Sequence, residues 1–258
     1  MLRSMYTAGT AMLTYNRKMD VITNNLTNVE TSGYKMDTMA TRSFRDLLIS
    51  RINDPSMYVK QSVGGHNTGI HVDQSYTTFS VGNMDSTDIK TDLALTDDGF
   101  FVIDYTGEDD ENEVLRYTRN GAFNVDAEGM LVTGGGHYVQ GEGGPIEVGS
   151  KDFTVNAEGY VFNAEGEEVD RLLVMKFPDN RALRKEGDNM YFNYDPEGNE
   201  PEQVTVEVLQ GFLEGSNVDT GREMVNMMQT YRAYEINQHI LRIIDESLGR
   251  AVNDIARI

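Results

Sequence analysis

The sequence predicts an α+β fold, with paired N- and C-terminal coiled-coil-like helices and a central antiparallel, mostly β domain. Both ends of the chain carry an apolar heptad repeat, which is the a/d seam of a coiled-coil helix. Between Asp92 and Val208 the apolar period changes to two and turn residues recur, as in an antiparallel β domain. Within that stretch a ten-residue unit repeats after thirty residues.

The N-terminal repeat consists of two apolar series, each with a step of seven residues and offset by three. The first series contains Met5, Met12, Met19 and Leu26, and the second contains Ala8, Tyr15, Ile22 and Val29. They predict a helix from about Ser4 to about Val29 that stops near Gly33, which can take the left-handed cap.

Two further predictions concern the segment that follows. Ser43 and Asp46 have the spacing of a capping pair, and the apolar residues after them share one helical face, so a short helix is expected over Ser43–Ile52. Residues 53–90 hold few apolar side chains and are expected to be extended or irregular, with one strand near Gly69–Val72.

The repeated unit in the β region begins at Phe123 and recurs thirty residues later. Each copy predicts a strand, a turn and a strand. The turn opens with Asp126 or Asn156, and Gly129 or Gly159 takes the positive φ of a bulged hairpin. Such turns are chemically able to bind calcium, but no segment matches an EF-hand loop, so hairpins are predicted.

The C-terminal helix is predicted to begin at Thr220, which stands at capping-box spacing from Glu223. Its apolar series steps by seven through Met227, Tyr234, Leu241, Leu248 and Ile255, and the offset series contains Ile244, Ala251 and Ile258. The polar Asn237 also stands at a seam position. Four segments are therefore expected: an N-terminal helical segment that pairs with the C-terminal helix, an extended linker, an antiparallel β domain, and a C-terminal loop and helix. Their predicted limits are 1–52, 53–90, 91–209 and 210–258.

The charge distribution limits the classes of molecule that are expected to bind this chain. The net charge is −20, and residues 51–210, with eleven basic and thirty-one acidic side chains, carry a balance of −20 by themselves. Nucleic acid is therefore not expected as a partner, because neutralising phosphates needs a basic face. The absence of cysteine excludes disulfides and cysteine-ligated metals. Neither a transmembrane helix nor an ordinary signal peptide is expected.

No catalytic chemistry is predicted. The sequence lacks the Gly-x-Ser-x-Gly, His-Glu-x-x-His and Walker motifs. His66 and His71 lie in one loop region and are more simply a solvated pair than a metal site. The acidic run Glu108–Glu113 is most simply a hairpin tip. We expect no enzyme activity, no cofactor, no metal and no small-molecule substrate.

Several stretches together resemble the bacterial flagellar rod and hook proteins. Residues 1–8 and 19–35 resemble the N-terminal signature of that family, and residues 210–219, 223–227 and 232–237 resemble its C-terminal signature. Residues 92–102, 117–123 and 185–191 are similar to motifs between them. The resemblance covers both termini and several points between, in order.

The resemblance implies a structural subunit of the flagellar basal-body rod. Such a subunit is exported through the flagellar type III apparatus without a cleaved signal peptide, polymerises through its terminal helices into the axial tube, and transmits torque from motor to hook. The implied partners are copies of itself, other rod and hook subunits and the export apparatus. The implied location is the basal body, across cell wall or periplasm. Chain length favours a rod subunit of the proximal-to-distal type. A hook-type subunit and a secreted, coiled-coil-tethered binding module are the alternatives.

The expected assembly interface comprises the two helical seams and the polar residues near the end of the first helix. Its members are Met5, Ala8, Met12, Tyr15, Met19, Ile22, Asn24, Asn25, Leu26, Asn28, Val29, Gly33, Met227, Tyr234, Asn237, Leu241, Ile244, Leu248, Ala251 and Ile255.

Overall fold

The computed structural model describes residues 2–50, 62–105 and 114–255. The chain forms two compact units, and each unit is assembled from discontinuous stretches. Unit 1 comprises Met1–Leu26, Asp37–Tyr76 and Thr220–Ile258, and unit 2 comprises Thr27–Met36 and Thr77–Asp219. The chain therefore enters unit 2 twice. The four segment limits expected from the sequence stay a prediction.

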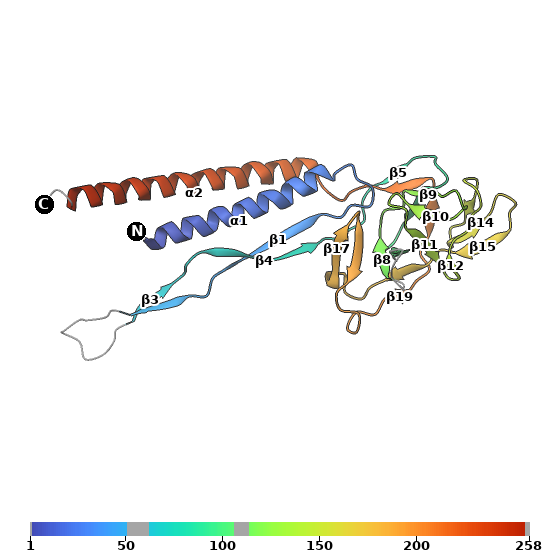
Figure 1. Ribbon diagram of the computed structural model, residues 1–258, viewed down its shortest axis with the longest axis horizontal. Coiled ribbons are helices and arrows are strands. Elements are labelled where there is room, and N and C mark those ends of the chain that lie inside the picture. Colours follow the sequence, from blue (N-terminus) through green and yellow to red (C-terminus); the bar gives the residue numbers. More distant parts are fainter. Residues whose placement is uncertain (1, 51–61, 106–113, 256–258) are drawn as a thin grey trace. The chain divides into compact units, whose positions relative to one another are not determined.

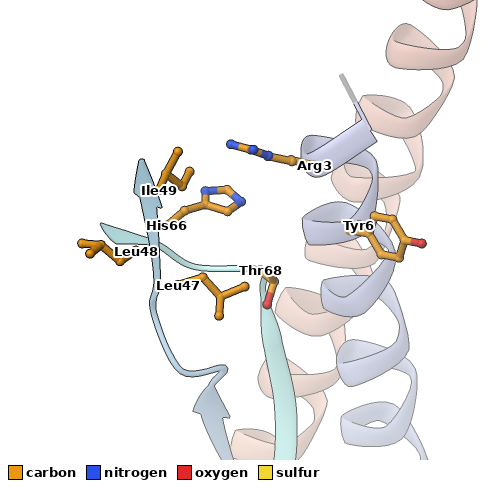
Figure 2. A pocket seen from close by; sticks show the side chains of 7 residues that line it. All are labelled: Arg3, Tyr6, Leu47, Leu48, Ile49, His66 and Thr68. Carbon is orange, nitrogen blue, oxygen red and sulfur yellow. The ribbon is translucent and has the colours of Figure 1, made fainter. Parts of the chain in front are cut away.

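Unit 1 contains both long helices and two antiparallel strand pairs. Its elements are α1 (Leu2–Thr27), β1 (Asp37–Ser43), β2 (Leu47–Ser50), β3 (Ser62–His66), β4 (Ile70–Thr77) and α2 (Thr220–Ile255). Strand β1 pairs with β4, and β2 with β3. Figures 1 and 2 draw α1 and α2 alongside one another, and Figure 1 shows that the two helices run in opposite directions. Both predicted terminal helices are thus confirmed.

The end of α1 differs from the prediction in one respect. The helix ends at Thr27, two residues before the expected end, and a turn closed by the Thr31 N–H to Asn28 carbonyl bond (3.2 Å) follows. Gly33 has the expected positive φ of 69°, but it lies six residues beyond the helix and is not its cap. Asparagine and threonine favour caps and turns over helix interiors, which explains the earlier stop.

The predicted helix over Ser43–Ile52 is wrong for the described residues. Strand β1 continues to Ser43, and β2 pairs with β3 from Leu47, opposite His66, to Ser50, opposite Ser62. Residues 51 and 52 lie outside the described part. A helix of ten residues is marginal without a partner for its apolar face, whereas strand pairing satisfies the backbone directly. The strand expected near Gly69–Val72 is present as the start of β4.

Unit 2 is built from short strands, and every pairing described in it is antiparallel, as predicted. Its largest sheet has the order β17-β18-β8-β7-β11-β10-β9, with β12 on β11, and with β16 joining β7 to β19. Three smaller groups are β13-β14-β15, β20-β6 and β21-β5.

The bounds of these elements are β5 (Met84–Ser86), β6 (Leu93–Leu95), β7 (Phe100–Asp104), β8 (Leu115–Thr118), β9 (Phe123–Val125), β10 (Leu131–Thr133), β11 (Tyr138–Gly141), β12 (Gly144–Pro145), β13 (Thr154–Val155), β14 (Tyr160–Phe162), β15 (Glu168–Arg171), β16 (Val174–Lys176), the short 3₁₀ helix η1 (Asn180–Ala182), β17 (Leu183–Gly187), β18 (Met190–Asn193), β19 (Glu202–Gln203), β20 (Val208–Gln210) and β21 (Phe212–Glu214).

Strand β7 is buried on both faces and separates two hydrophobic clusters. Phe101 packs into the larger cluster with Leu131 and other aliphatic side chains. Its neighbours Phe100 and Val102 point the other way, into a mostly aromatic cluster that contains Tyr191. This division follows from the alternation of side chains along a strand. The apolar run of β7 therefore marks the centre of unit 2.

The thirty-residue repeat forms two matching hairpins, as predicted. Strands β9 and β10 flank the first turn, and β13 and β14 flank the second. The N–H of Gly129 donates to the Asp126 carbonyl, and the N–H of Gly159 donates to the Asn156 carbonyl, both at 3.0 Å. The two glycines have φ values of 86° and 85°. The acidic run Glu108–Glu113 lies outside the described residues.

The two equivalent turn glycines should respond differently to substitution. Alanine at either position incurs left-handed strain of about 1–2 kcal/mol. At Gly129 a Cβ would also lie 2.8 Å from the Gly149 Cα, whereas at Gly159 the nearest atom is a side-chain carbon 3.7 Å away. We therefore expect Gly129→Ala to lower the free energy of unfolding more than Gly159→Ala does, as measured by urea unfolding. Gly166→Ala, with φ of 85° and an open surrounding, is the strain-only control. Equal losses at positions 129 and 159 would contradict this account.

Candidate assembly interface

The predicted seam of α1 forms its less exposed face. Ala8 and Ile22 are buried, Met12, Tyr15, Met19 and Leu26 are partly buried, and only Met5, near the start of the helix, is exposed. Thr14, which the heptad count leaves out, is also buried. Its hydroxyl lies 3.3 Å from the Ile70 carbonyl of β4. One side of α1 therefore carries the seam, and another contacts the β1–β4 pair.

The predicted seam of α2 is partly buried at every position where the side chain is described. These positions are Met227, Tyr234, Asn237, Leu241, Ile244, Leu248 and Ala251. The side chain of Ile255 lies outside the described part. The amide of Asn237 donates to the Ala233 carbonyl one turn earlier (2.7 Å), so this polar seam residue is satisfied within its own helix.

Two polar members of this seam are not among the residues of the expected assembly interface. Glu223 and Thr230 are buried and continue the step of seven from Asn237 towards the start of α2. The Thr230 hydroxyl donates to the Asn226 carbonyl (2.7 Å), and the Asn226 amide donates to the Glu223 carboxylate (2.9 Å). A search for apolar residues misses both positions, whereas a search for the seven-residue step alone finds them.

The polar residues near the end of α1 have separate roles. Asn25 is buried and makes two bonds with the backbone of Asp37: its amide donates to the Asp37 carbonyl (2.9 Å), and its side-chain oxygen accepts the Asp37 N–H (3.0 Å). Asn28 accepts a bond from the Thr31 hydroxyl (3.3 Å). Asn24 is exposed and Val29 is partly buried. Asn25 therefore ties α1 to the start of β1.

Unit 2 contains a fully buried charge cluster that the heptad pattern does not reveal. The Lys35 ammonium lies 2.5 Å from one Glu214 carboxylate oxygen, and the Arg119 guanidinium lies 3.3 Å from the other. The exposed fractions of these three side chains are 0% for Lys35 and 1% for Glu214 and Arg119. Asp98, 3.8 Å from Arg119 and half exposed, is a second, weaker counter-charge. Two cations thus share one buried carboxylate. We call Lys35, Glu214 and Arg119 the buried clamp.

Further hydrogen bonds reach the clamp from the backbone, although the Arg119 Nε is buried without a hydrogen-bond partner among the described residues. Lys35 also donates to the Ser80 carbonyl (2.7 Å), and Glu214 accepts the Gly82 N–H (2.9 Å). Burial lowers the pKa of Lys35, and the adjacent Glu214 carboxylate opposes that shift. Burial also lowers the pKa of Arg119, again against the effect of Glu214. The carboxylate is therefore what makes two buried cations tolerable.

Backbone contacts around the clamp join the two chain segments that connect to the helices. The Gly33 N–H donates to the Glu214 carbonyl (2.6 Å), and the Met36 N–H donates to the Asn217 side chain (2.7 Å). Gly33 also approaches residues 119–120 so closely that a Cβ would lie 2.4 Å from the Asn120 nitrogen. Within unit 2, the segment after α1 and the segment before α2 are thus fastened to each other.

Metal-ligating side chains do not gather among the described residues. These residues contain no cluster of three or more histidine, cysteine or acidic side chains that could hold a metal. Figure 2 shows a pocket in unit 1 lined by Arg3, Tyr6, Leu47, Leu48, Ile49, His66 and Thr68, with no carboxylate among them. His71 stacks on Phe44 with ring centroids 4.6 Å apart. Neither helix, over the part that the structure describes, is long and apolar enough to span a membrane.

Three family models match the chain in order. The model described as "Flagella basal body rod protein" matches residues 5–35, "Flagellar hook protein FlgE/F/G D1 domain" matches residues 94–163, and "Flagellar basal body rod FlgEFG protein C-terminal" matches residues 209–254. The first and third contain most of the two helical seams.

Curated relatives are similar over the whole chain. The "Flagellar hook-basal body complex protein FlhO" of Bacillus subtilis is 30% identical over 274 residues, which cover 100% of both chains. The "Flagellar basal-body rod protein FlgG" of the same organism is 33% identical over 271 residues, 98% of this chain and 99% of that protein. The "Flagellar hook protein FlgE" of Helicobacter mustelae is 37% identical over 146 residues, 55% of this chain but 31% of that protein.

The loss of stability that a substitution in the buried clamp causes should depend on which charge it leaves without a partner. Glu214→Gln leaves Lys35 and Arg119 buried without their shared carboxylate and should lower the free energy of unfolding by about 3–5 kcal/mol. Lys35→Met leaves the Glu214–Arg119 pair intact and should be less damaging. The double variant Lys35→Met, Glu214→Gln should be more stable than Glu214→Gln alone, because it leaves one unpaired buried cation instead of two. Urea unfolding followed by tyrosine near-UV circular dichroism measures all three, and a double variant less stable than Glu214→Gln would contradict the account.

Stability should also depend on pH through Lys35. Because its pKa is lower in the folded chain than the value of about 10.4 in the unfolded chain, the unfolded chain binds more protons between these two values. Stability from this group therefore rises with pH in that window and is lost as pH falls through the folded pKa. Relative to Lys35→Met, the wild type should gain stability as the pH rises from the lowered pKa of Lys35 in the folded chain towards about 10.4. Parallel pH profiles of the two proteins would refute this.

Proposed function

The chain belongs to the family of flagellar basal-body rod and hook proteins, and we propose that it polymerises through its terminal helices into the axial tube of the rod, which transmits torque from motor to hook. It is a structural subunit of the flagellar basal body. The observation that carries the proposal is the end-to-end similarity to proteins named as rod and hook–basal body components.

The helical seams support polymerisation as the mode of assembly. The seam residues of α1 and α2 lie on one face of each helix, and their seven-residue step is the pattern of helices that pack on helices. Non-closing, head-to-tail contacts between copies would build a helical tube instead of a ring. All twenty residues of the expected assembly interface are therefore proposed as contact residues within or between copies.

A rod position fits better than a hook position. The rod relative aligns over 98% of this chain and 99% of its own length, whereas the hook relative aligns over 55% of this chain and 31% of its own length, so the similarity to the rod relative is the more extensive. The other alternative, a coiled-coil-tethered binding module, would form a closed oligomer of fixed mass. A rod subunit is monomeric when dilute and grows when nucleated.

The proposal extends to partners and location. The partners are copies of the same chain, other rod and hook subunits and the flagellar type III export apparatus, and the subunit crosses the inner membrane without a cleaved signal peptide to reach cell wall or periplasm. It has no enzymatic activity in this proposal. The acidic balance of residues 51–210 suits a solvated surface that resists aggregation.

Charges in the α1 seam should block assembly while leaving unit 2 folded. The double variant Met12→Asp and Leu26→Asp places two carboxylates on the partly buried face of α1. In a strain that lacks the wild-type chain, we expect it to abolish rod incorporation and swimming, since each charge would be buried without a partner. Soft-agar motility and imaging of purified basal bodies measure these effects.

The matched control for this experiment is Asn16→Asp, which adds a carboxylate to an exposed position of the same helix. It should support normal swimming. The tyrosine near-UV circular dichroism signal of unit 2 should be unchanged in both proteins. A motile Met12→Asp, Leu26→Asp strain would contradict the proposed role of the seam in assembly.

A further inference from the structure

Unit 1 contains a pocket of about 520 Å³ whose lining includes none of the seam residues. It lies between the first turns of α1 and the β2–β3 pair, and its wall is mostly apolar, with Leu47 and Ile49 among the residues that line it. Figure 2 shows the Arg3 side chain extending from α1 towards Ile49 and His66. A mostly apolar pocket of this size with a few polar groups has the character of a ligand site. We call it the α1–β2 pocket.

The lining of the α1–β2 pocket includes a cation but no carboxylate. Arg3 is exposed, and in the described part of the chain no carboxylate forms an ion pair with it, whereas Arg17 and Arg42 of the same unit have carboxylates at 3.9 and 3.4 Å. The Nε2 atom of His66 is buried and has no hydrogen-bond partner among the described residues. Phosphate oxygens would accept hydrogen bonds from both Arg3 and His66. The polar part of the expected ligand is therefore an anion.

Strand β2 exposes apolar side chains on both of its faces. Leu47 and Leu48 are 57% and 74% exposed, and neighbouring side chains of a strand point to opposite faces. Figure 2 shows Leu48 pointing away from α1. A small anion in the pocket would leave most of Leu48 in water, whereas a membrane surface offers an anionic layer and an apolar layer together. The two features favour a lipid surface over a small soluble ligand.

The two units differ in charge, and only unit 1 suits an anionic surface. Its stretches contain twelve basic and ten acidic side chains, a balance of +2. Those of unit 2 contain ten basic and thirty-two acidic side chains, a balance of −22. Anionic lipids would therefore repel unit 2 and attract basic groups such as Arg3. Charge thus selects the unit that contains the pocket.

We propose that the free chain binds the surface of a membrane that contains anionic phospholipids through the α1–β2 pocket. A lipid phosphate binds Arg3, with His66 beside it, and Leu48 inserts among the first methylene groups of the acyl chains. This binding goes beyond the proposed function, because polymerisation into the rod does not require lipid. It gives the free subunit a membrane contact before the subunit is built into the rod.

Co-sedimentation of the dilute full chain with lipid vesicles measures this binding. We expect binding to phosphatidylglycerol vesicles and not to phosphatidylcholine vesicles, and release as the ionic strength rises from about 0.05 M to about 0.5 M, because salt screens the attraction. Leu48→Asn should weaken binding at least about tenfold, because it removes the inserted apolar side chain. Arg3→Gln should weaken it about fivefold, which corresponds to the loss of one basic group near the surface.

Two matched variants control for these changes. Val169→Asn makes the same kind of replacement at an exposed apolar side chain of unit 2, and Arg17→Gln removes an exposed arginine of α1 that already faces Asp20. Both should bind vesicles as the wild type does. Far-UV circular dichroism checks that each variant is folded. Leu48→Thr, which keeps a residue that favours strands, replaces Leu48→Asn if the latter loses structure.

Four outcomes would overturn the inference. The first is a wild type that does not bind phosphatidylglycerol vesicles or binds phosphatidylcholine vesicles equally well, and the second is a Leu48→Asn chain that binds as tightly as the wild type. The third is calorimetric binding of octyl phosphate or inorganic phosphate without vesicle binding, which would assign the pocket to a soluble anion. The fourth is self-association that Leu48→Asn abolishes, without vesicle binding, which would assign the exposed side of β2 to another copy of the chain.

Discussion

The buried clamp is the interaction on which the arrangement of unit 2 depends. Glu214 lies between Lys35 and Arg119, so one carboxylate compensates two cations that have lost their water. Lys35 follows α1 in the chain and Glu214 precedes α2, and the two are 179 residues apart. A buried ion pair is weak evidence for stability but strong evidence for a specified geometry, because each partner is costly without the other. Here that geometry brings together the two points at which the chain connects to its helices.

The same constraint explains details that local sequence reasoning misassigns. Gly33 was expected to cap α1, yet its positive φ lies six residues after the helix, where the backbone must pass against residues 119–120. The segment 27–36 is a stretch of unit 2 inserted between two parts of unit 1. Its conformation is decided by what it packs on, and a count of helix-forming residues carries no information about that.

The less exposed faces of the two helices could be predicted, because a seven-residue step can be found in the sequence without knowing what the face contacts. Every described seam residue of α2 is partly buried, as its period indicates. The apolar count nevertheless missed Thr14, Glu223 and Thr230, which are polar and yet buried. It also gave no weight to Ile236 and Ile243, which are apolar and yet exposed. Periodicity identifies one face of a helix and does not report how many neighbours the helix has.

The sequence by itself determined both terminal helices, the antiparallel β character of the middle and the turn glycines at 129 and 159, since each depends on a local period or a single backbone conformation. Only the tertiary structure decided that residues 43–50 are strand, that Gly129 is crowded by Gly149 while Gly159 is not, and that Lys35, Arg119 and Glu214 meet. The physical reason is the same in all three cases. Strand pairing, close backbone approach and charge compensation join residues far apart in the chain, and neither partner carries a local signal of the other.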